Sequence, residues 1–361
     1  MAVRRPRASL RTGSRAVVTA VAVLGSAAAL AVTTPGVAGA GTTATTKNSA
    51  RAAAGWLARQ LTGANRDHIV TSFTPQPDPG LAADVVLSFD AAGVAQNSAQ
   101  RVTKWLRSQA KSFTAQPGAG RDPGRLAKLL LVAEAQHADV HDFGGLNLVR
   151  LLKQAERPSG AFTDTGDPTK GDSPVSQALA LIALSHTGSL SDWPNAAAIG
   201  WLVSQQCGDG GFYYASQASP PQNCNDVDST AFAAQALLTV HSSVAASAVH
   251  WLQTHRNPDG GYGLAFGSST PSSNANSTAV TVQALRQAGY SAGYGLSWLH
   301  KHQIGCSGLA SRRGAVKYDN SGYDRSSAVY ATAQAGQALA KKWLGDISRD
   351  GASTVEPRLA C

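Results

Sequence analysis

A Trp-Leu pair recurs along this chain of 361 residues at intervals of about 50 positions. One interval is about twice as long as the others, and a degenerate copy of the pair at Arg150-Leu151 divides it. A repeat of this length indicates an array of supersecondary units, because no single unit can bury its apolar face alone. The anchors of the six predicted units are Trp56, Trp105, Arg150, Trp201, Trp251 and Trp298.

Each unit also carries a second apolar segment, rich in Ala, Leu, Gln and Val, that has the pattern of a helix. Its apolar residues recur at spacings of three and four, and the alternation typical of strands is not sustained. We expect side-chain oxygens to cap the starts of these helices and glycines to mark their ends. The expected caps are Ser229 or Asp228, Ser277 and Ser326, and the expected ends are Gly93, Gly188 and Gly289.

Six units of two helices predict an all-α fold, an (α/α)6 toroid over residues 48–345, followed by a C-terminal tail, residues 346–361. Ala-rich helices can pack closely in an inner ring, and the Trp-Leu helices would then form the outer ring. An open solenoid would need a polar cap at each end, whereas a closed ring needs none. We therefore predict closure.

The loop between the two helices of a unit has a motif of its own. Asp209-Gly210-Gly211-Phe212 and Asp259-Gly260-Gly261-Tyr262 each lie eight residues after a Trp. Asp and Gly in this order are typical of turns, because Asp starts the turn and Gly adopts backbone angles that other residues avoid. A worn copy lies between Gln154 and Phe162.

Trp-Leu, Gln-Gln and then Asp-Gly-Gly-aromatic resembles the repeat motif of the terpene-cyclase and protein-prenyltransferase superfamily. The resemblance covers about residues 50–345. It implies an α/α toroid with a central cavity, here as a single-toroid, secreted member. The same toroid occurs in complement-type thioester domains and in cobalamin carriers, so the motif leaves the activity open.

The first 40 residues predict a signal peptide. Five arginines precede an apolar run over 16–32, and Ala38-Gly39-Ala40 offers a cleavage site. The run is too short and too Ala-rich to predict a membrane span, and none follows it. We expect a secreted, extracellular protein without a membrane span after signal removal. The net charge of +9 comes partly from the leader, and scattered Lys and Arg do not favour nucleic-acid binding.

Four cysteines in an exported chain favour two disulfides. Of three possible pairings we prefer Cys207–Cys224, which brackets one loop, and Cys306–Cys361, which would attach the tail. The cysteine spacing does not match a zinc site, and two histidine pairs lack an evident third ligand. We therefore predict no metal.

The segment Asn225–Ala231 resembles the Asp-x-Asp-Asp-Thr-Ala motif by which squalene-hopene-type cyclases protonate their substrate. The resemblance implies that Asp228 is a general acid with Asp226 as its neighbour, although Ser229 replaces the last Asp. Two close carboxylates can raise one pKa, as an acid needs. Helix capping explains the segment as well, because the next unit has Asn274 in the equivalent slot.

We favour binding over catalysis. A toroid without catalytic motifs is similar in architecture to the helical domain of cobalamin carriers, which implies a separate partner domain. The leading hypothesis is a secreted protein whose mouth holds a bulky, partly apolar ligand, a corrinoid such as cobalamin first and an isoprenoid second. The alternatives are a terpene cyclase- or prenyltransferase-type enzyme with Asp228 as general acid, and a structural or protein-docking envelope module. The expected ligand-binding residues are Asp164, Asp209, Tyr213, Tyr214, Tyr262, Asn274 and Tyr323.

Overall fold

Every predicted unit folds into one outer helix followed by one inner helix. The computed structural model describes residues 44–74, 76–187, 196–263 and 272–361. The outer helices are α1 (Ser49–Gln60), α3 (Gln96–Thr114), α5 (Leu148–Ala155), α7 (Ala196–Ser204), α9 (Ala245–Thr254) and α11 (Gly293–His302). The inner helices are α2 (Pro79–Ala92), α4 (Pro123–Ala135), α6 (Pro174–Ser185), α8 (Val227–Thr239), α10 (Ala275–Gln287) and α12 (Arg325–Leu339).

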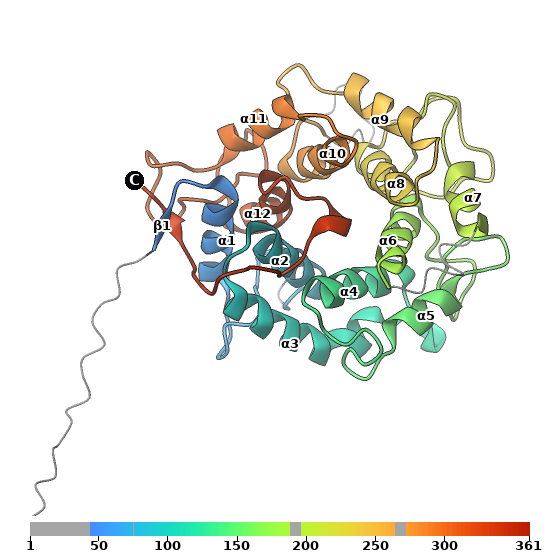
Figure 1. Ribbon diagram of the computed structural model, residues 1–361, viewed down its shortest axis with the longest axis horizontal. Coiled ribbons are helices and arrows are strands. Elements are labelled where there is room, and N and C mark those ends of the chain that lie inside the picture. The colour runs from blue at the N-terminus through green and yellow to red at the C-terminus, as the bar shows by residue number, and fades with distance from the viewer. Residues whose placement is uncertain (1–43, 75, 188–195, 264–271) are drawn as a thin grey trace, which may run out of the picture. The chain divides into compact units, whose positions relative to one another are not determined.

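The inner helices form a closed ring within the unit Thr43–Cys361 (Figure 1). Each packs against the next, and α12 packs against both α2 and α1, so that the last unit meets the first. Small side chains permit this packing. Ala331, Ala335 and Ala338 of α12 are fully buried, and a Cβ on Gly336 would collide with Ser88 of α2. The predicted all-α toroid and its closure are confirmed.

The loop motif links neighbouring units through the indole groups. Asp209 Oδ2 accepts a hydrogen bond of 3.0 Å from Trp251 Nε1 of the next unit. Asp259 Oδ2 accepts one of 2.9 Å from Trp298 Nε1 in the same way. Trp56 of the first unit donates to the carbonyl oxygen of Ser311 in the last, at 3.1 Å. The Trp of each of these units is therefore anchored by the preceding loop, and the third bond closes the ring.

The first glycine of the loop motif has a positive φ, and Gly314 takes the equivalent position in the last unit, two residues before Val316. Gly210, Gly260 and Gly314 have φ of +93°, +93° and +94°, a region that other residues rarely adopt. A Cβ on Gly314 would collide with the carbonyl oxygen of Ala52 on the next outer helix. The motif therefore serves the contact between units.

The expected N-caps are wrong by two or three residues. Asp226, Asn274 and Asp324 cap α8, α10 and α12, each accepting from a backbone N–H three residues later. Ser229 and Ser277, expected as caps, are donors in these bonds, at 2.7 and 2.9 Å. The sequence offered several side-chain oxygens in a row, and the cap is the one whose backbone is still extended. Gly93 ends α2 as expected, Gly289 lies just beyond α10, and Gly188 lies outside the described residues.

The chain after α12 crosses the end of the ring where the inner helices stop (Figure 1). A 3-10 turn, η2 (Leu344–Asp346), is followed by contacts of Arg349 N with Ala135 O and of Ser353 N with Gly93 O. Strand β2 (Arg358–Leu359) then pairs in parallel with β1 (Thr45–Thr46). Another 3-10 turn, η1 (Pro117–Ala119), precedes α4. One end of the ring is therefore covered by the chain's own tail.

Both preferred disulfides are present. Cys207–Cys224 and Cys306–Cys361 have Cα–Cα distances of 5.9 and 5.5 Å. The first closes the loop before α8, and the second attaches the last residue to the loop after α11. The predicted signal peptide lies outside the described residues.

Candidate ligand-binding site

The centre of the ring holds a cavity of about 180 Å³ to which all six inner helices contribute. Leu344, in the η2 turn, also lines it, and its backbone N–H donates to Gln235 Oε1 of α8 at 3.2 Å. The segment from η2 onward, which we call the tail from here on, is therefore the floor of the cavity. Its lining consists of Asp84, Leu87, Lys128, Leu131, Val175, Leu179, Phe232, Val280, Gln283, Gln334, Gln337 and Leu344.

A second cavity of about 440 Å³ lies toward the starts of the inner helices. Asn276 and Tyr330 line it, one helical turn before Val280 and Gln334 of the lower cavity. The two cavities therefore follow one another along the ring axis. We call the upper one the mouth compartment, the lower one the floor compartment, and both together the axial bowl. Phe73, Tyr318 and Ser327 complete the mouth compartment.

The wall of the floor compartment carries a charge pair and paired amides. Lys128 Nζ lies 2.8 and 2.9 Å from the two carboxylate oxygens of Asp84. Gln283 Nε2 donates to Gln337 Oε1 at 3.0 Å. The polar groups in the wall are thus bonded to each other, while Phe232, Leu131 and Leu179 offer apolar surface. Such a lining suits an apolar ligand, since the paired groups need no further partner.

Asp228 lies on α8 one turn before Phe232, on the face that turns toward the axis. Burial raises the pKa of this carboxyl to about 6, a nearby Asp226 adds to the increase, and a hydrogen bond from Ser277 opposes it. Its Oδ1 is buried and has no hydrogen-bond partner among the described residues. Asp226, by contrast, is occupied as the cap of α8. The two carboxyl groups thus differ in role, and Asp228 is the available one.

Some of the predicted mouth residues lie near the starts of α8 and α10. The rings of Tyr213 and Tyr214 lie 4.5 Å apart, and the pKa of Tyr213 is raised by its hydrogen bond to Tyr214, by burial, and by the charges of Tyr214 and Asp226. Asn274 caps the neighbouring helix α10. These residues surround the starts of α8 and α10 without lining either compartment of the axial bowl.

Other predicted residues point elsewhere. Asp209 is held by Trp251, Gly211 and Cys224 between two units. Asp164 is buried and folds its own loop by accepting from Gly166 N at 2.7 Å. Tyr262 lines an outer groove between α9 and α11, and burial raises its pKa to about 12. Tyr323 lies under the guanidinium of Arg312, 4.3 Å from its ring.

Phe73 is the mouth residue that the repeat pattern does not indicate. It lies in the irregular connection between α1 and α2, and its side chain is 60% exposed. Its ring lies 6.0 Å from that of Tyr330. The sequence signal for this residue would have been its chemistry, because an aromatic side chain in a polar, proline-containing loop is not needed there for packing.

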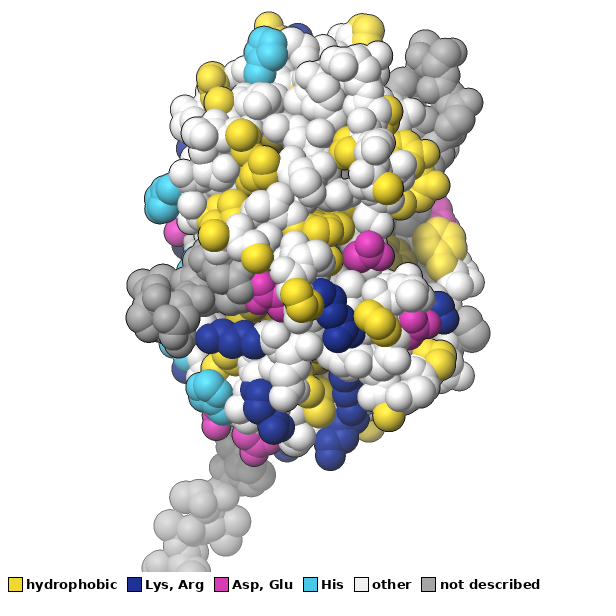
Figure 2. Space-filling model, turned by 90° about the vertical axis from the view of Figure 1, so that its right-hand side faces the viewer, with side chains coloured by type: hydrophobic (Ala, Val, Ile, Leu, Met, Phe, Trp, Pro, Cys, Tyr) yellow, Lys and Arg dark blue, Asp and Glu magenta, His cyan; other side chains and the backbone are white. Residues whose placement is uncertain are grey.

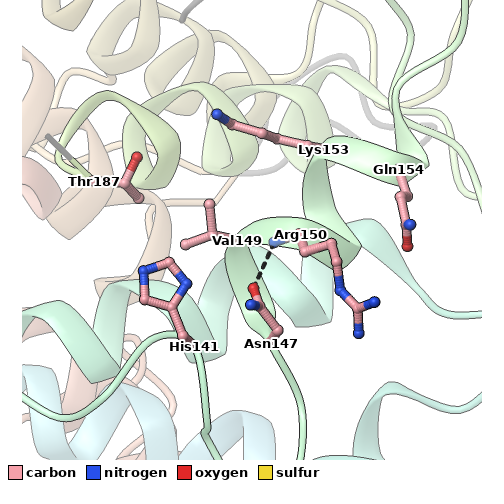
Figure 3. Close-up of a pocket in the computed structure, with 7 residues that line it drawn as sticks. All are labelled: His141, Asn147, Val149, Arg150, Lys153, Gln154 and Thr187. Carbon is pink, nitrogen blue, oxygen red and sulfur yellow. Dashed lines mark hydrogen bonds between the residues drawn. The ribbon is translucent and has the colours of Figure 1, made fainter. Parts of the chain in front are cut away.

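The outer surface has a groove of about 520 Å³ beside α5 (Figure 3). His141, Val149 and Thr187 lie across it from one another, and Asn147 is occupied as the cap of α5. Lys and Arg side chains gather on the lower half of the face in Figure 2, which is the half nearest α5. This groove lies outside the ring and borders residues that the structure does not describe, so we do not place the site there.

Within the described residues, no cluster of three His, Cys, Asp or Glu side chains could hold a metal ion. No helix in the described part of the chain is both long and apolar enough to cross a bilayer.

Known structures share this architecture. A protein from Actinoplanes aligns with a TM-score of 0.55 at 16% identity, over 81% of this chain and 98% of that one. Type II terpene cyclase MstE from Scytonema has a TM-score of 0.55 at 14% identity, over 81% and 96%. Unsaturated glucuronyl hydrolase from Bacillus sp. GL1 has a TM-score of 0.57 at 14% identity, over 81% and 95%. The chain has the α/α-toroid fold.

The comparisons confirm the resemblance of the repeat to the toroid superfamily, but at the level of fold alone. No protein-family profile and no curated protein sequence matches the chain. A terpene cyclase and a glycoside-cleaving enzyme align with nearly the same TM-score, so the fold does not choose between chemistries. The function has to be argued from the axial bowl.

Proposed function

We propose that this protein binds an elongated, largely apolar small molecule in the axial bowl. The observation that carries the proposal is the pair of consecutive cavities, one floored by the tail and one lined by aromatic rings. Together they have the size and the mixed lining typical of small-molecule sites. The two disulfides further suit a protein that works outside the cell, as we propose.

The shape of the bowl favours an isoprenoid over a corrinoid. The floor compartment, at about 180 Å³, is the smaller of the two and follows the mouth compartment along the axis, and we propose that a bound ligand occupies both. A flexible chain can follow this path, whereas a disc-shaped macrocycle would have to lie across the mouth and would need a separate partner domain above it. As support, the Scytonema terpene cyclase has been crystallised with geranylgeranyl dihydroxybenzoate, a substrate with a long isoprenoid chain.

Calorimetric titration with geranylgeraniol tests this proposal, and cobalamin is the comparison ligand. We expect geranylgeraniol to bind with a Kd on the order of micromolar. Phe232→Trp adds bulk to the floor compartment and should weaken binding about tenfold or more. Tyr290→Trp, a comparable change on the outer surface, should leave it unchanged.

Unchanged affinity in the Phe232 variant would remove the axial bowl as the site. Binding of cobalamin without binding of geranylgeraniol would overturn the ligand class and restore the corrinoid hypothesis. Binding of neither would favour a structural or protein-docking role.

Proton transfer by Asp228 is the second candidate function. The unpartnered Oδ1 and the nearby aromatic rings favour it. The protonated carboxyl would give its proton to an alkene carbon of the ligand, the carbocation would lose a different proton, and solvent would restore the acid. Incubation with squalene or geranylgeranyl diphosphate, followed by mass spectrometry of extracted products, tests this. Cyclic products lost in Asp228→Asn would establish an enzyme, and their absence in the wild type would remove this candidate.

A further inference from the structure

The mouth compartment is an aromatic cage with an acidic surround. Phe73, Tyr318 and Tyr330 reach it from three separate segments: the α1–α2 connection, the loop before α12, and α12 itself. The rings of Phe73 and Tyr330 are 6.0 Å apart and inclined by 33°. The Phe73 side chain is largely exposed and is not part of the hydrophobic core of the described residues. Three aromatic side chains therefore line one compartment, and the face of an aromatic ring is negatively polarised.

Carboxylates lie beside the cage. The Tyr330 hydroxyl donates to Asp78 Oδ2 at 2.8 Å, which places a carboxylate at the hydroxyl edge of the ring. The nearby guanidinium of Arg325 donates to Gln60 Oε1 and to the carbonyl oxygen of Val70, at 3.0 Å each. Asp228 lies close enough to Tyr318 to raise the pKa of that phenol, together with burial as the larger cause. The described lining of the compartment contains no basic side chain. The local field therefore favours a cation.

One amide oxygen at this site, Oδ1 of Asn276, lacks a hydrogen-bond partner among the described residues. Asn276 Nδ2 donates to Gln334 Oε1 at 2.7 Å, which fixes the orientation of the amide. Its Oδ1 is buried and finds no hydrogen-bond partner within the described residues. Such an atom is rare in a native structure unless a ligand or a water satisfies it. Asn276 lines the mouth compartment, and this oxygen is buried within its wall.

We propose that the mouth compartment binds the alkylated ammonium group of a cationic amphiphile whose apolar chain extends into the floor compartment. The inference rests on the proposed binding function of the axial bowl and specifies its ligand. Methyl or methylene groups on a charged nitrogen spread the positive charge over carbon, so that ring faces recognise it better than hydrogen-bond acceptors do. The carboxylates of Asp78 and Asp228 supply the countercharge, and the Asn276 side chain forms part of the wall.

A pair of isosteric probes tests the inference. Dodecyltrimethylammonium and its neutral analogue with a tert-butyl group in place of trimethylammonium are titrated below their aggregation limits. The two probes differ in charge and hardly in size. We expect the cation to bind the wild-type protein at least about tenfold more tightly, which corresponds to about 1.4 kcal/mol.

Tyr330→Leu and Asp228→Asn should each reduce this preference severalfold and leave the affinity of the neutral probe nearly unchanged. Tyr330→Phe keeps the ring, so it should keep most of the preference and serves as the matched control. Tyr290→Leu, on the outer surface, is the second control. Circular dichroism of each variant verifies its fold.

Equal affinity for both probes, with both blocked by Phe232→Trp, would overturn the ammonium inference and leave the proposed binding function intact. Failure of both probes and of geranylgeraniol to bind would overturn the two together. A preference that survives Tyr330→Leu in full would show that the cage does not produce it, and would also refute the inference.

Discussion

Replacing Trp by Phe at three equivalent ring positions separates the hydrogen bonds that join neighbouring repeats. Trp56, Trp251 and Trp298 are all at most 2% exposed, so the loss of ring volume costs a similar amount at each. Their acceptors differ. The indoles of Trp251 and Trp298 donate to carboxylates, and that of Trp56 donates to a backbone carbonyl.

The expected magnitudes follow from the acceptor. A hydrogen bond to a charged group contributes about 1.5–3 kcal/mol and a neutral one about 0.5–1.5 kcal/mol. Trp251→Phe should therefore lower the free energy of unfolding by about 1 kcal/mol more than Trp56→Phe. Asp259 is more exposed than Asp209, so solvent screens its bond and the loss for Trp298→Phe should lie between the two.

Urea denaturation followed by far-ultraviolet circular dichroism measures these differences by linear extrapolation. A double-mutant cycle of Asp209→Asn with Trp251→Phe isolates the contribution of the acceptor's charge, since the Asn oxygen can still accept from the indole, and we expect a coupling energy of about 1 kcal/mol. Equal losses at all three positions, together with a coupling energy near zero, would refute the reasoning that Asp of the loop motif holds the next repeat.

Three further predictions concern backbone, charge and pH. Gly314→Ala should lower the free energy of unfolding, measured in urea, by at least about 2 kcal/mol, because the positive φ and the carbonyl oxygen of Ala52 both oppose a Cβ. Gly93→Ala is the control: φ is also positive there, but the space around it is open, so the loss should be about 1 kcal/mol. Lys128→Met should cost about 1 kcal/mol, because Asp84 loses its partner while both groups are only partly buried. Asp84→Leu in the same chain should restore most of the loss, whereas no restoration would contradict the pairing. The raised pKa of Asp228 means that the folded state holds this proton more tightly than the unfolded chain, so its contribution to stability is complete below about pH 4 and is lost as pH rises through 6. Asp228→Asn should flatten thermal stability across that range, and an unchanged profile would contradict the raised pKa.

The repeat in the sequence predicted most of the fold because it is enforced by contacts between units. Each Trp anchor marks an outer helix, and each Ala-rich segment marks an inner one. The disulfides were also predictable, since Cys207 and Cys224 bracket one loop. The exact caps were not, because Asp226, Asp228 and Ser229 offer similar oxygens and only the backbone decides among them.

The site was less predictable because loop motifs and ligand sites draw on the same residue types. Asp209 and Tyr262 are prominent in the sequence, yet they bond or pack between repeats. Phe73 is inconspicuous, yet it lines the mouth compartment. The role of the tail as a floor also depends on a crossing that no local pattern encodes, since Leu344 reaches Gln235 from more than a hundred residues away.

A crystal structure of the protein grown with geranylgeraniol tests the central claim most directly. We expect continuous electron density along the ring axis, from Tyr330 in the mouth compartment down to Phe232 above the tail. Density confined to the outer grooves, or an axial bowl that stays closed to the ligand at saturating concentration, would contradict the account.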